Sequence, residues 1–301
     1  RELYFVTCMF LFIPVRLIIA PAFSASESGN LLSAAKLTVN SPELHSTGGR
    51  ISAVDLELNL LKRLANGGSI IARNLALNTP DITNSGLIYG EAGYQVRVDN
   101  LSNSGTLSSP AKIDIAALHD RLDIHNSGNI GANNGVSLDA GKNIANSGQI
   151  RSGNGLSLGA GHDINNGGQL FAGGTLNLGA GNDINNSATI SGELLNISAN
   201  SLNNSETGSI TQRGPYTLNI HTADYDTANN PYNTIRTPKP AASGSGASGD
   251  SAGSEAAAAE GTLKIGSQFN NRGVFEINNM LSVTASNSFT NHQTAEFARL
   301  T

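Results

Sequence analysis

The strongest constraint on this chain is an internal repeat of about 20 residues. Four successive units each open on asparagine, carry Ile or Leu four residues later, and then an aliphatic pair separated by one polar residue. The opening asparagines are 20 positions apart each time: Asn126, Asn146, Asn166 and Asn186. Similar units begin upstream at Asn66, Asn84, Asn103 and, more weakly, Ser46, and downstream at Asn204 and Asn271, giving about ten coils. Because so short a unit cannot bury its apolar side chains alone, the units must stack on one another.

The order of residues within a unit predicts short strands. Single aliphatic residues flanked by polar ones, and aliphatic pairs such as Leu156-Ser-Leu158, fit strands whose alternate side chains point inward. The intervals hold Gly and Asn, which tolerate left-handed backbone angles, so we expect turns there. No window has helical spacing. We therefore predict a parallel β-helix with three short strands and three turns per coil. Its stacked asparagines are expected to form a hydrogen-bonded ladder: Asn126, Asn146, Asn166 and Asn186.

Composition supports a narrow aliphatic core and excludes several classes of protein. Aromatic residues make up 5% of the 301 residues and Trp is absent, whereas wide globular cores normally use aromatic side chains. The net charge is −5 and no cluster of Lys and Arg occurs, which argues against nucleic acid as a partner. The single cysteine, Cys8, excludes an internal disulfide and any Cys-based zinc site.

The repeat divides the chain into five expected segments. An apolar, signal-like or relic stretch comes first; Pro14 and Arg16 interrupt it, so it predicts no membrane span. A tyrosine-containing excursion follows the main repeats and is the best candidate for contact with a partner, through Tyr216, Tyr225 and Tyr232. A Pro/Ala/Ser/Gly tract is predicted to be disordered. The expected ranges are 1–29 (apolar), 30–212 (β-helix), 213–236 (excursion), 237–262 (linker) and 263–301 (resumed coils).

The N-S-G-x-I…L-x-L-x-A-G repeats resemble the haemagglutinin repeats of filamentous-haemagglutinin-like exoproteins, over residues 30–212 and more weakly 263–291. The resemblance implies a right-handed parallel β-helix shaft, exported by two-partner secretion through an outer-membrane transporter and displayed at the bacterial surface. A host or neighbouring-cell surface, protein or glycan, is then the expected contact. The family's Asn-Pro-Asn-type motifs do not follow the apolar segment and no toxin or receptor-binding module follows residue 291, so we expect a piece of shaft or a decayed gene fragment.

Particular residues suggest alternatives to a passive shaft. Asp163 and Asp183 share one position in successive coils and suggest calcium, but their 20-residue period differs from the roughly nine-residue period of calcium-binding solenoids, and two carboxylates supply too few ligands. The triplet His119-Asp120-Arg121 is the densest charged group in the regular coils, yet a surface turn is expected rather than a carbohydrate-active site. We therefore predict a structural or adhesive shaft with no enzymatic activity, metal or cofactor. The stalk of a contact-dependent growth inhibition toxin is the alternative.

Overall fold

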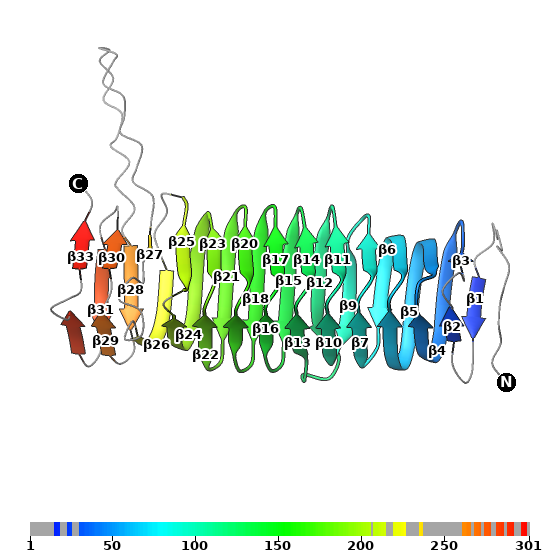
Figure 1. Ribbon diagram of the computed structural model, residues 1–301, viewed down its shortest axis with the longest axis horizontal. Coiled ribbons are helices and arrows are strands. Elements are labelled where there is room, and N and C mark those ends of the chain that lie inside the picture. The colour runs from blue at the N-terminus through cyan, green and yellow to red at the C-terminus, as the bar shows by residue number, and fades with distance from the viewer. Residues whose placement is uncertain are drawn as a thin grey trace, which may run out of the picture.

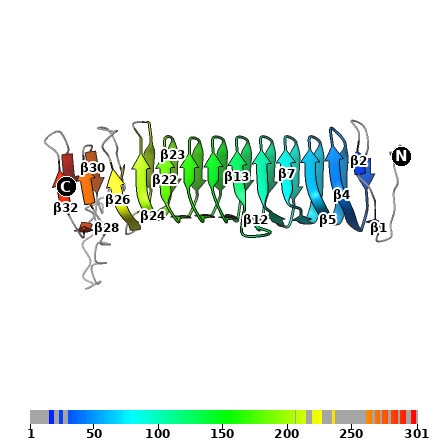
Figure 2. The same ribbon diagram turned by 90° about the horizontal axis from the view of Figure 1, so that it is seen from below.

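The chain forms an elongated rod of parallel strands (Figure 1). The computed structural model describes residues 30–205 and 207–214, together with the backbone of the strands given below that lie outside these ranges. It contains 33 strands, and the described residues form no helix. A view turned by 90° shows the same stack of coils running along the rod (Figure 2). The predicted β-helix is confirmed, and it winds through about nine turns.

The strands lie on three faces, and each face is one parallel ladder. Face A contains β2 (Phe23–Ala25), β7 (Asp81–Asn84), β10 (Asn100–Asn103), β13 (Asp123–Asn126), β16 (Ile144–Asn146), β19 (Ile164–Asn166), β22 (Asp183–Asn186), β29 (Gln268–Asn271) and β32 (Ser288–Asn291). Face B contains β3 (Asn30–Leu32), β8 (Leu87–Gly90), β11 (Thr106–Ser109), β14 (Asn129–Ala132), β17 (Gln149–Ser152), β20 (Gln169–Ala172), β23 (Thr189–Gly192), β25 (Ser209–Gln212), β27 (Ile235–Arg236), β30 (Val274–Ile277) and β33 (Glu296–Arg299). Face C contains β1 (Val15–Ile18), β9 (Tyr94–Val98), β12 (Lys112–Ala117), β15 (Gly135–Ala140), β18 (Gly155–Ala160), β21 (Thr175–Ala180), β28 (Gly261–Ile265) and β31 (Leu281–Ala285). Longer strands bend around the corners between faces: β4 (Lys36–Ser46), β5 (Arg50–Asn66), β6 (Ser69–Asn78), β24 (Leu194–Asn204) and β26 (Asn219–Asp226).

Equivalent residues stack in register from coil to coil. On face B, Ile130 pairs with Ile150, Ile150 with Leu170, and Leu170 with Ile190. All four side chains are buried, so the expected single inward-facing file is present. Burial of each such side chain contributes roughly 2 kcal/mol. The file closes only because the coils above and below cover it, which makes the stability of the rod collective.

The core departs from its aliphatic pattern at Tyr94 on face C. Its side chain takes a place filled by Leu75 in the preceding coil and Ile113 in the next. Gly90 makes room for the ring, because a Cβ there would lie 2.6 Å from the Tyr94 Cδ1. Burial raises the pKa of Tyr94, and its hydroxyl has no hydrogen-bond partner among the described residues. Tyr94 is therefore held by packing alone.

The corner glycines correct one expectation. Left-handed backbone angles were expected at the turns, but among the described residues only Gly93 and Asp120 have positive φ. The glycines are required for a different reason: a Cβ on Gly148, the third residue of its turn, would lie 2.1 Å from the carbonyl oxygen of Gly128 in the coil before. The same close approach recurs at Gly86, Gly105, Gly128 and Gly168, at 2.0 to 2.2 Å. In these coils the corners stack so closely that a side chain at that position would force the backbone to shift.

Strands outside the main coils extend the ladders at both ends. Within the expected apolar segment 1–29, β1 and β2 pair in parallel with β4. Within the expected irregular segment 213–236, β26 and β27 instead pair with β24 and β25, so the ladder runs on through part of that segment. Strands β28 to β33 pair with one another in the same three-face order. The expected linker lies outside the described residues up to residue 260, and the segment boundaries stay predictions.

Replacing Gly148 with Ala should lower the free energy of unfolding by about 1–3 kcal/mol, because the added methyl overpacks the corner against the Gly128 carbonyl. The rod already contains one such residue: Ala188 occupies this position, and there the Thr189 N–H to Gly168 O bond lengthens to 3.2 Å from the 2.8 Å of Gln169 N to Gly148 O. Gly131→Ala is the matched control, since its nearest contact would be at 4.0 Å. Urea unfolding followed by circular dichroism measures both, and equal losses would contradict the close-stacking explanation.

Candidate functional site

A continuous ladder of buried asparagine side chains runs inside the corner between faces A and B. In each coil the Nδ2 group donates to the Oδ1 atom of the equivalent asparagine in the next coil, at 2.7 to 2.8 Å. The ladder contains Asn66, Asn84, Asn103, Asn126, Asn146, Asn166, Asn186 and Asn204. It brings together the four asparagines named from the repeat and continues beyond them in both directions. All four added members open units of the repeat, and two of them, Asn84 and Asn103, carry the Asn-Ser-Gly motif.

Each ladder amide also closes its own turn. Asn126 Nδ2 donates to Asn146 Oδ1 at 2.8 Å, to Gly128 O in its own turn at 3.2 Å, and to Gln149 O at 3.1 Å. Its Oδ1 accepts from Asn103 Nδ2 at 2.7 Å. A buried amide is tolerated in an apolar core only when its donors and acceptors are satisfied, and here they are. The same amide therefore stabilises the turn of its own coil and fixes the position of the next coil.

The ladder begins abruptly at Asn66. The residue in register with it in the preceding coil is Ser46, whose shorter side chain donates to Gly49 O at 3.4 Å instead. Asn66 Oδ1 is consequently buried without a hydrogen-bond partner. An unsatisfied buried acceptor costs about 1–3 kcal/mol. The first described coil is thus joined to the rod less strongly than later ones at this corner.

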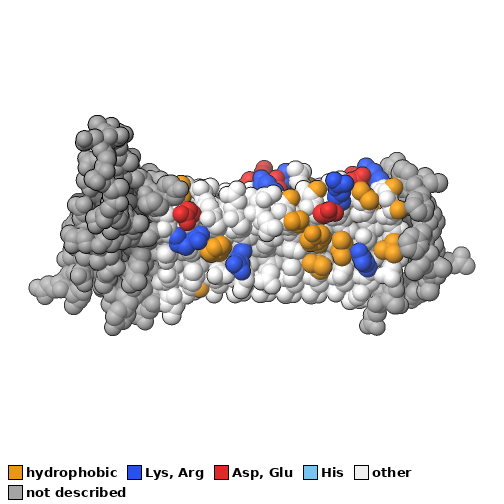
Figure 3. Space-filling view, turned by 90° about the horizontal axis from the view of Figure 1, so that it is seen from above, with side chains coloured by type: hydrophobic (Ala, Val, Ile, Leu, Met, Phe, Trp, Pro, Cys, Tyr) orange, Lys and Arg blue, Asp and Glu red, His pale blue; other side chains and the backbone are white. Residues whose placement is uncertain are grey.

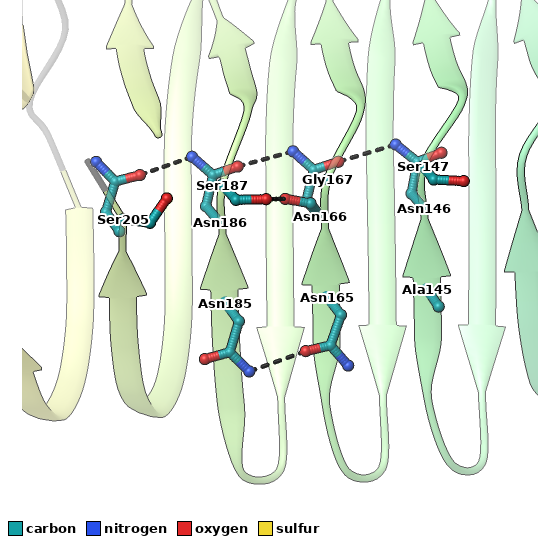
Figure 4. Close-up of a pocket in the computed structure, with 11 residues that line it drawn as sticks. Ala145, Asn146, Ser147, Asn165, Asn166, Gly167, Asn185, Asn186, Ser187 and Ser205 are labelled. Carbon is teal, nitrogen blue, oxygen red and sulfur yellow. Dashed lines mark hydrogen bonds between the residues drawn. The ribbon is translucent and has the colours of Figure 1, made fainter. Parts of the chain in front are cut away.

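A shallow trough lies outside the ladder, across four successive coils (Figure 4). Its volume is about 490 Å³. The outward residues of face A, Ala145, Asn165 and Asn185, form one side, and the turn residues Ser147, Gly167, Ser187 and Ser205 form the other. Asn185 Nδ2 donates to Asn165 Oδ1 at 2.9 Å along the first side. None of the residues that line the trough is charged or aromatic.

Asp163 and Asp183 stand at the corner between faces C and A as links between coils. Asp183 N–H donates to Asp163 Oδ1, and Asp163 N–H donates to Asn143 Oδ1, both at 3.2 Å. The Asp163 side chain therefore accepts a backbone hydrogen bond from the following coil, as Asn143 does one coil earlier, a use that the spacing of the aspartates did not suggest. Across the described ranges there is no group of three or more His, Cys, Asp or Glu side chains that could hold a metal ion.

The triplet His119-Asp120-Arg121 lies in the turn between β12 and β13, and the structure fastens that turn to the preceding coil. His119 Nδ1 lies 2.7 Å from Asp99 Oδ2, and His119 N–H donates to Asp99 Oδ1 at 2.8 Å. Burial alone would raise the pKa of Asp99, but these hydrogen bonds and the nearby positive charges outweigh burial, so the pKa lies below its ordinary value. Both oxygens of the Asp99 carboxylate are therefore used to hold His119 in the turn.

Face B carries a small cluster of cationic and aromatic side chains. Phe171 points outward, with the Arg213 guanidinium 4.6 Å and the Arg151 guanidinium 5.3 Å from its ring centroid. Arg213 also donates to the carbonyl of Ala172, two coils back. Elsewhere the side of the rod seen in Figure 3 is mostly uncharged, with scattered charges and an apolar band toward its N-terminal half. The cluster connects side chains from different coils, and it was not predicted from the sequence.

The tyrosines expected to contact a partner are only partly placed. Tyr225 lies on β26, where its backbone pairs with Leu202 and Phe269. Its side chain, and all of Tyr216 and Tyr232, lie outside the described residues. Their role in partner contact stays a prediction. Within the described residues, no helix is long and apolar enough to cross a bilayer.

One comparison with known proteins finds a match. A family model described as haemagglutinin repeat matches residues 24–108, 65–224 and 240–293, which together cover well over half of the chain. No curated protein and no solved structure matches the chain. The matched ranges include every coil that carries the asparagine ladder.

Asn146→Ala should be strongly destabilising, because it leaves the Asn126 donor and the Asn166 acceptor buried without their ladder partners. Both groups keep weaker partners, Gly128 O and Gln149 O for Asn126 Nδ2 and Gly168 N for Asn166 Oδ1, so each lost ladder bond should cost roughly 0.5–1.5 kcal/mol. Asn134→Ala, at an exposed corner of the preceding coil, is the control and should change the free energy of unfolding by less than about 0.5 kcal/mol. Chemical denaturation measures both; a small effect at Asn146 would show that the ladder adds little to stability.

Ser46→Asn should stabilise the rod, since the new amide can donate to the unpartnered Asn66 Oδ1 and extend the ladder by one coil. The expected gain is about 1 kcal/mol, the usual net value of one intramolecular hydrogen bond. Ser46→Ala removes the hydroxyl without supplying a donor and should give no gain. Thermal melts of the two variants beside the parent chain decide the matter, and equal melting temperatures for Asn and Ala would refute the proposed gap.

Proposed function

Because the chain belongs to the haemagglutinin repeat family, we propose that it is a shaft segment of a secreted, filamentous-haemagglutinin-like bacterial surface exoprotein. The single observation that carries the proposal is the unbroken register of the three faces over successive coils. Stacking similar coils in this way produces a long, extended rod, which suits a spacer. Its role is to hold an adhesive or toxic module at a distance from the cell surface.

Stiffness follows from the way the coils are joined. Three kinds of interaction join neighbouring coils. They are the hydrogen bonds of the three parallel strand ladders, the corner hydrogen bonds such as Ser147 N to Asn126 O at 2.8 Å, and the side-chain hydrogen bond from Asn126 to Asn146. Bending the rod would stretch these bonds on one side and compress closely stacked glycine corners on the other. Such a structure resists bending without needing a wide core.

We further propose export through an outer-membrane two-partner secretion transporter and display at the bacterial surface. Each strand pairs only one coil back and one coil forward, as β13 does with β10 and β16. Contacts therefore span about 20 residues, and the rod can grow coil by coil as the chain emerges. With one cysteine in the sequence, the chain can cross the envelope without forming an internal disulfide.

Excision of one whole coil tests the shaft role. Removing residues 67–84 joins Asn66 to Ser85, restores the Asn-Ser-Gly motif and lets β5 meet β8 in register. The exoprotein should then still reach the cell surface and support adherence, with a rod shorter by about 4.8 Å. Removing residues 67–75, about half a coil, should break the register and reduce surface display.

Surface labelling of intact cells, an adherence assay and small-angle scattering of the purified chain give the three measurements. If the whole-coil deletion reached the surface at normal levels but abolished adherence, the chain would itself be the binding module and not a spacer. If scattering showed a compact particle, the rod would be wrong.

A further inference from the structure

We propose that the trough beside the asparagine ladder binds a linear, uncharged, β-linked glycan laid along the rod. The site comprises the outward residues Ala145, Asn165 and Asn185 and the turn residues Ser147, Gly167 and Ser187 (Figure 4). This goes beyond the proposed shaft role, which needs no ligand on the rod, and it would make this part of the shaft adhesive in its own right.

The spacing of the trough selects a repeating ligand. Its lining recurs once per coil over four coils, at the parallel-strand spacing of about 4.8 Å. A pyranose unit in an extended β-linked glycan advances by a similar length, so successive sugars can meet successive coils in the same way. An extended peptide advances only about 3.3 Å per residue and falls out of step. The periodicity therefore favours a glycan over a peptide.

The chemistry of the lining selects an uncharged ligand. No charged residue lines the trough, whereas face B carries Arg151 and Arg213. Within the described residues, Asn165 Nδ2 makes no hydrogen bond, since Ala145 in the preceding coil offers no acceptor; the Ser147 hydroxyl makes none either. These groups can bond sugar hydroxyls, and the aliphatic parts of the lining can receive the C–H face of a pyranose ring.

Two small residues open the trough at this place on the rod. In the three preceding coils of face A the outward positions are Thr83, Ser102 and His125, but the next one is Ala145. One coil further, the turn residue is Gly167, where the neighbouring coils have serine. A Cβ at Gly167 would make only ordinary contacts, the nearest at 3.6 Å, so this glycine is not required by the fold. Its absence of a side chain leaves space for a ligand.

A chain-length series of neutral β-linked oligosaccharides tests the proposal, using cello-, manno- and N-acetylchito-oligosaccharides titrated into the full chain by calorimetry and NMR. We expect affinity to rise with length up to about four sugars and then level off, and to be insensitive to salt. Ala145→Trp should weaken binding at least tenfold, whereas Thr83→Trp, at the equivalent outward position three coils away, should not.

Asn165→Ala provides a second, milder variant, since it removes the free Nδ2 donor and the Oδ1 atom that accepts from Asn185 without adding bulk; circular dichroism confirms that each variant is folded. No saturable binding to any of the three series would overturn the proposal. So would binding that Ala145→Trp and Asn165→Ala leave unchanged, or a preference for anionic glycans that salt abolishes, which would point to the arginines of face B. Loss of glycan binding in a variant that still forms a rod would leave the shaft role intact, so the two proposals fail separately.

Discussion

The pairing of each coil with the next, like residue on like residue, is the interaction on which the whole structure depends. A single coil has too few aliphatic side chains to offset the entropy of ordering its backbone. Once Ile150 lies on Ile130 and under Leu170, however, each side chain is covered on both sides and the strands acquire hydrogen-bond partners. Everything else in the rod, including the choice of corner residues, serves to keep that pairing in register.

Hydrophobic stacking alone would not fix the register, because Ile, Leu and Val replace one another along each file. The buried amides supply the missing specificity. A slip of one residue would place Asn146 opposite His125 or Ser127, whose side chains are exposed, and leave its buried amide without a ladder partner, at a cost comparable to the whole net value of several ordinary hydrogen bonds. The polar ladder thus excludes misaligned rods more than it strengthens the aligned one.

The period of the sequence was enough to predict the three strands per coil, the inward file through Ile130 and the family. It could not predict distances between backbones, and for that reason the glycine corners were given the wrong cause: what matters at Gly148 is the carbonyl of Gly128, not the sign of φ. Interactions that skip a coil, such as Arg213 with Phe171 and Ala172, leave no periodic mark. The trough likewise arises from two small residues, Ala145 and Gly167, which look like ordinary variation within the repeat.

The seven hydrogen bonds between the side-chain amides of the ladder all point the same way. Each runs from the Nδ2 group of one coil to the Oδ1 atom of the next coil toward the C-terminus. An incomplete rod therefore presents donor N–H groups at its advancing tip when it emerges N-terminus first. A carbonyl or carboxylate oxygen at the ladder position of the next coil can accept a hydrogen bond from these N–H groups. An amide also has an N–H group of its own that can donate to the following coil, whereas a carboxylate has none. Growth of the rod is chemically directional: an aspartate could end the ladder, whereas continuing it demands asparagine.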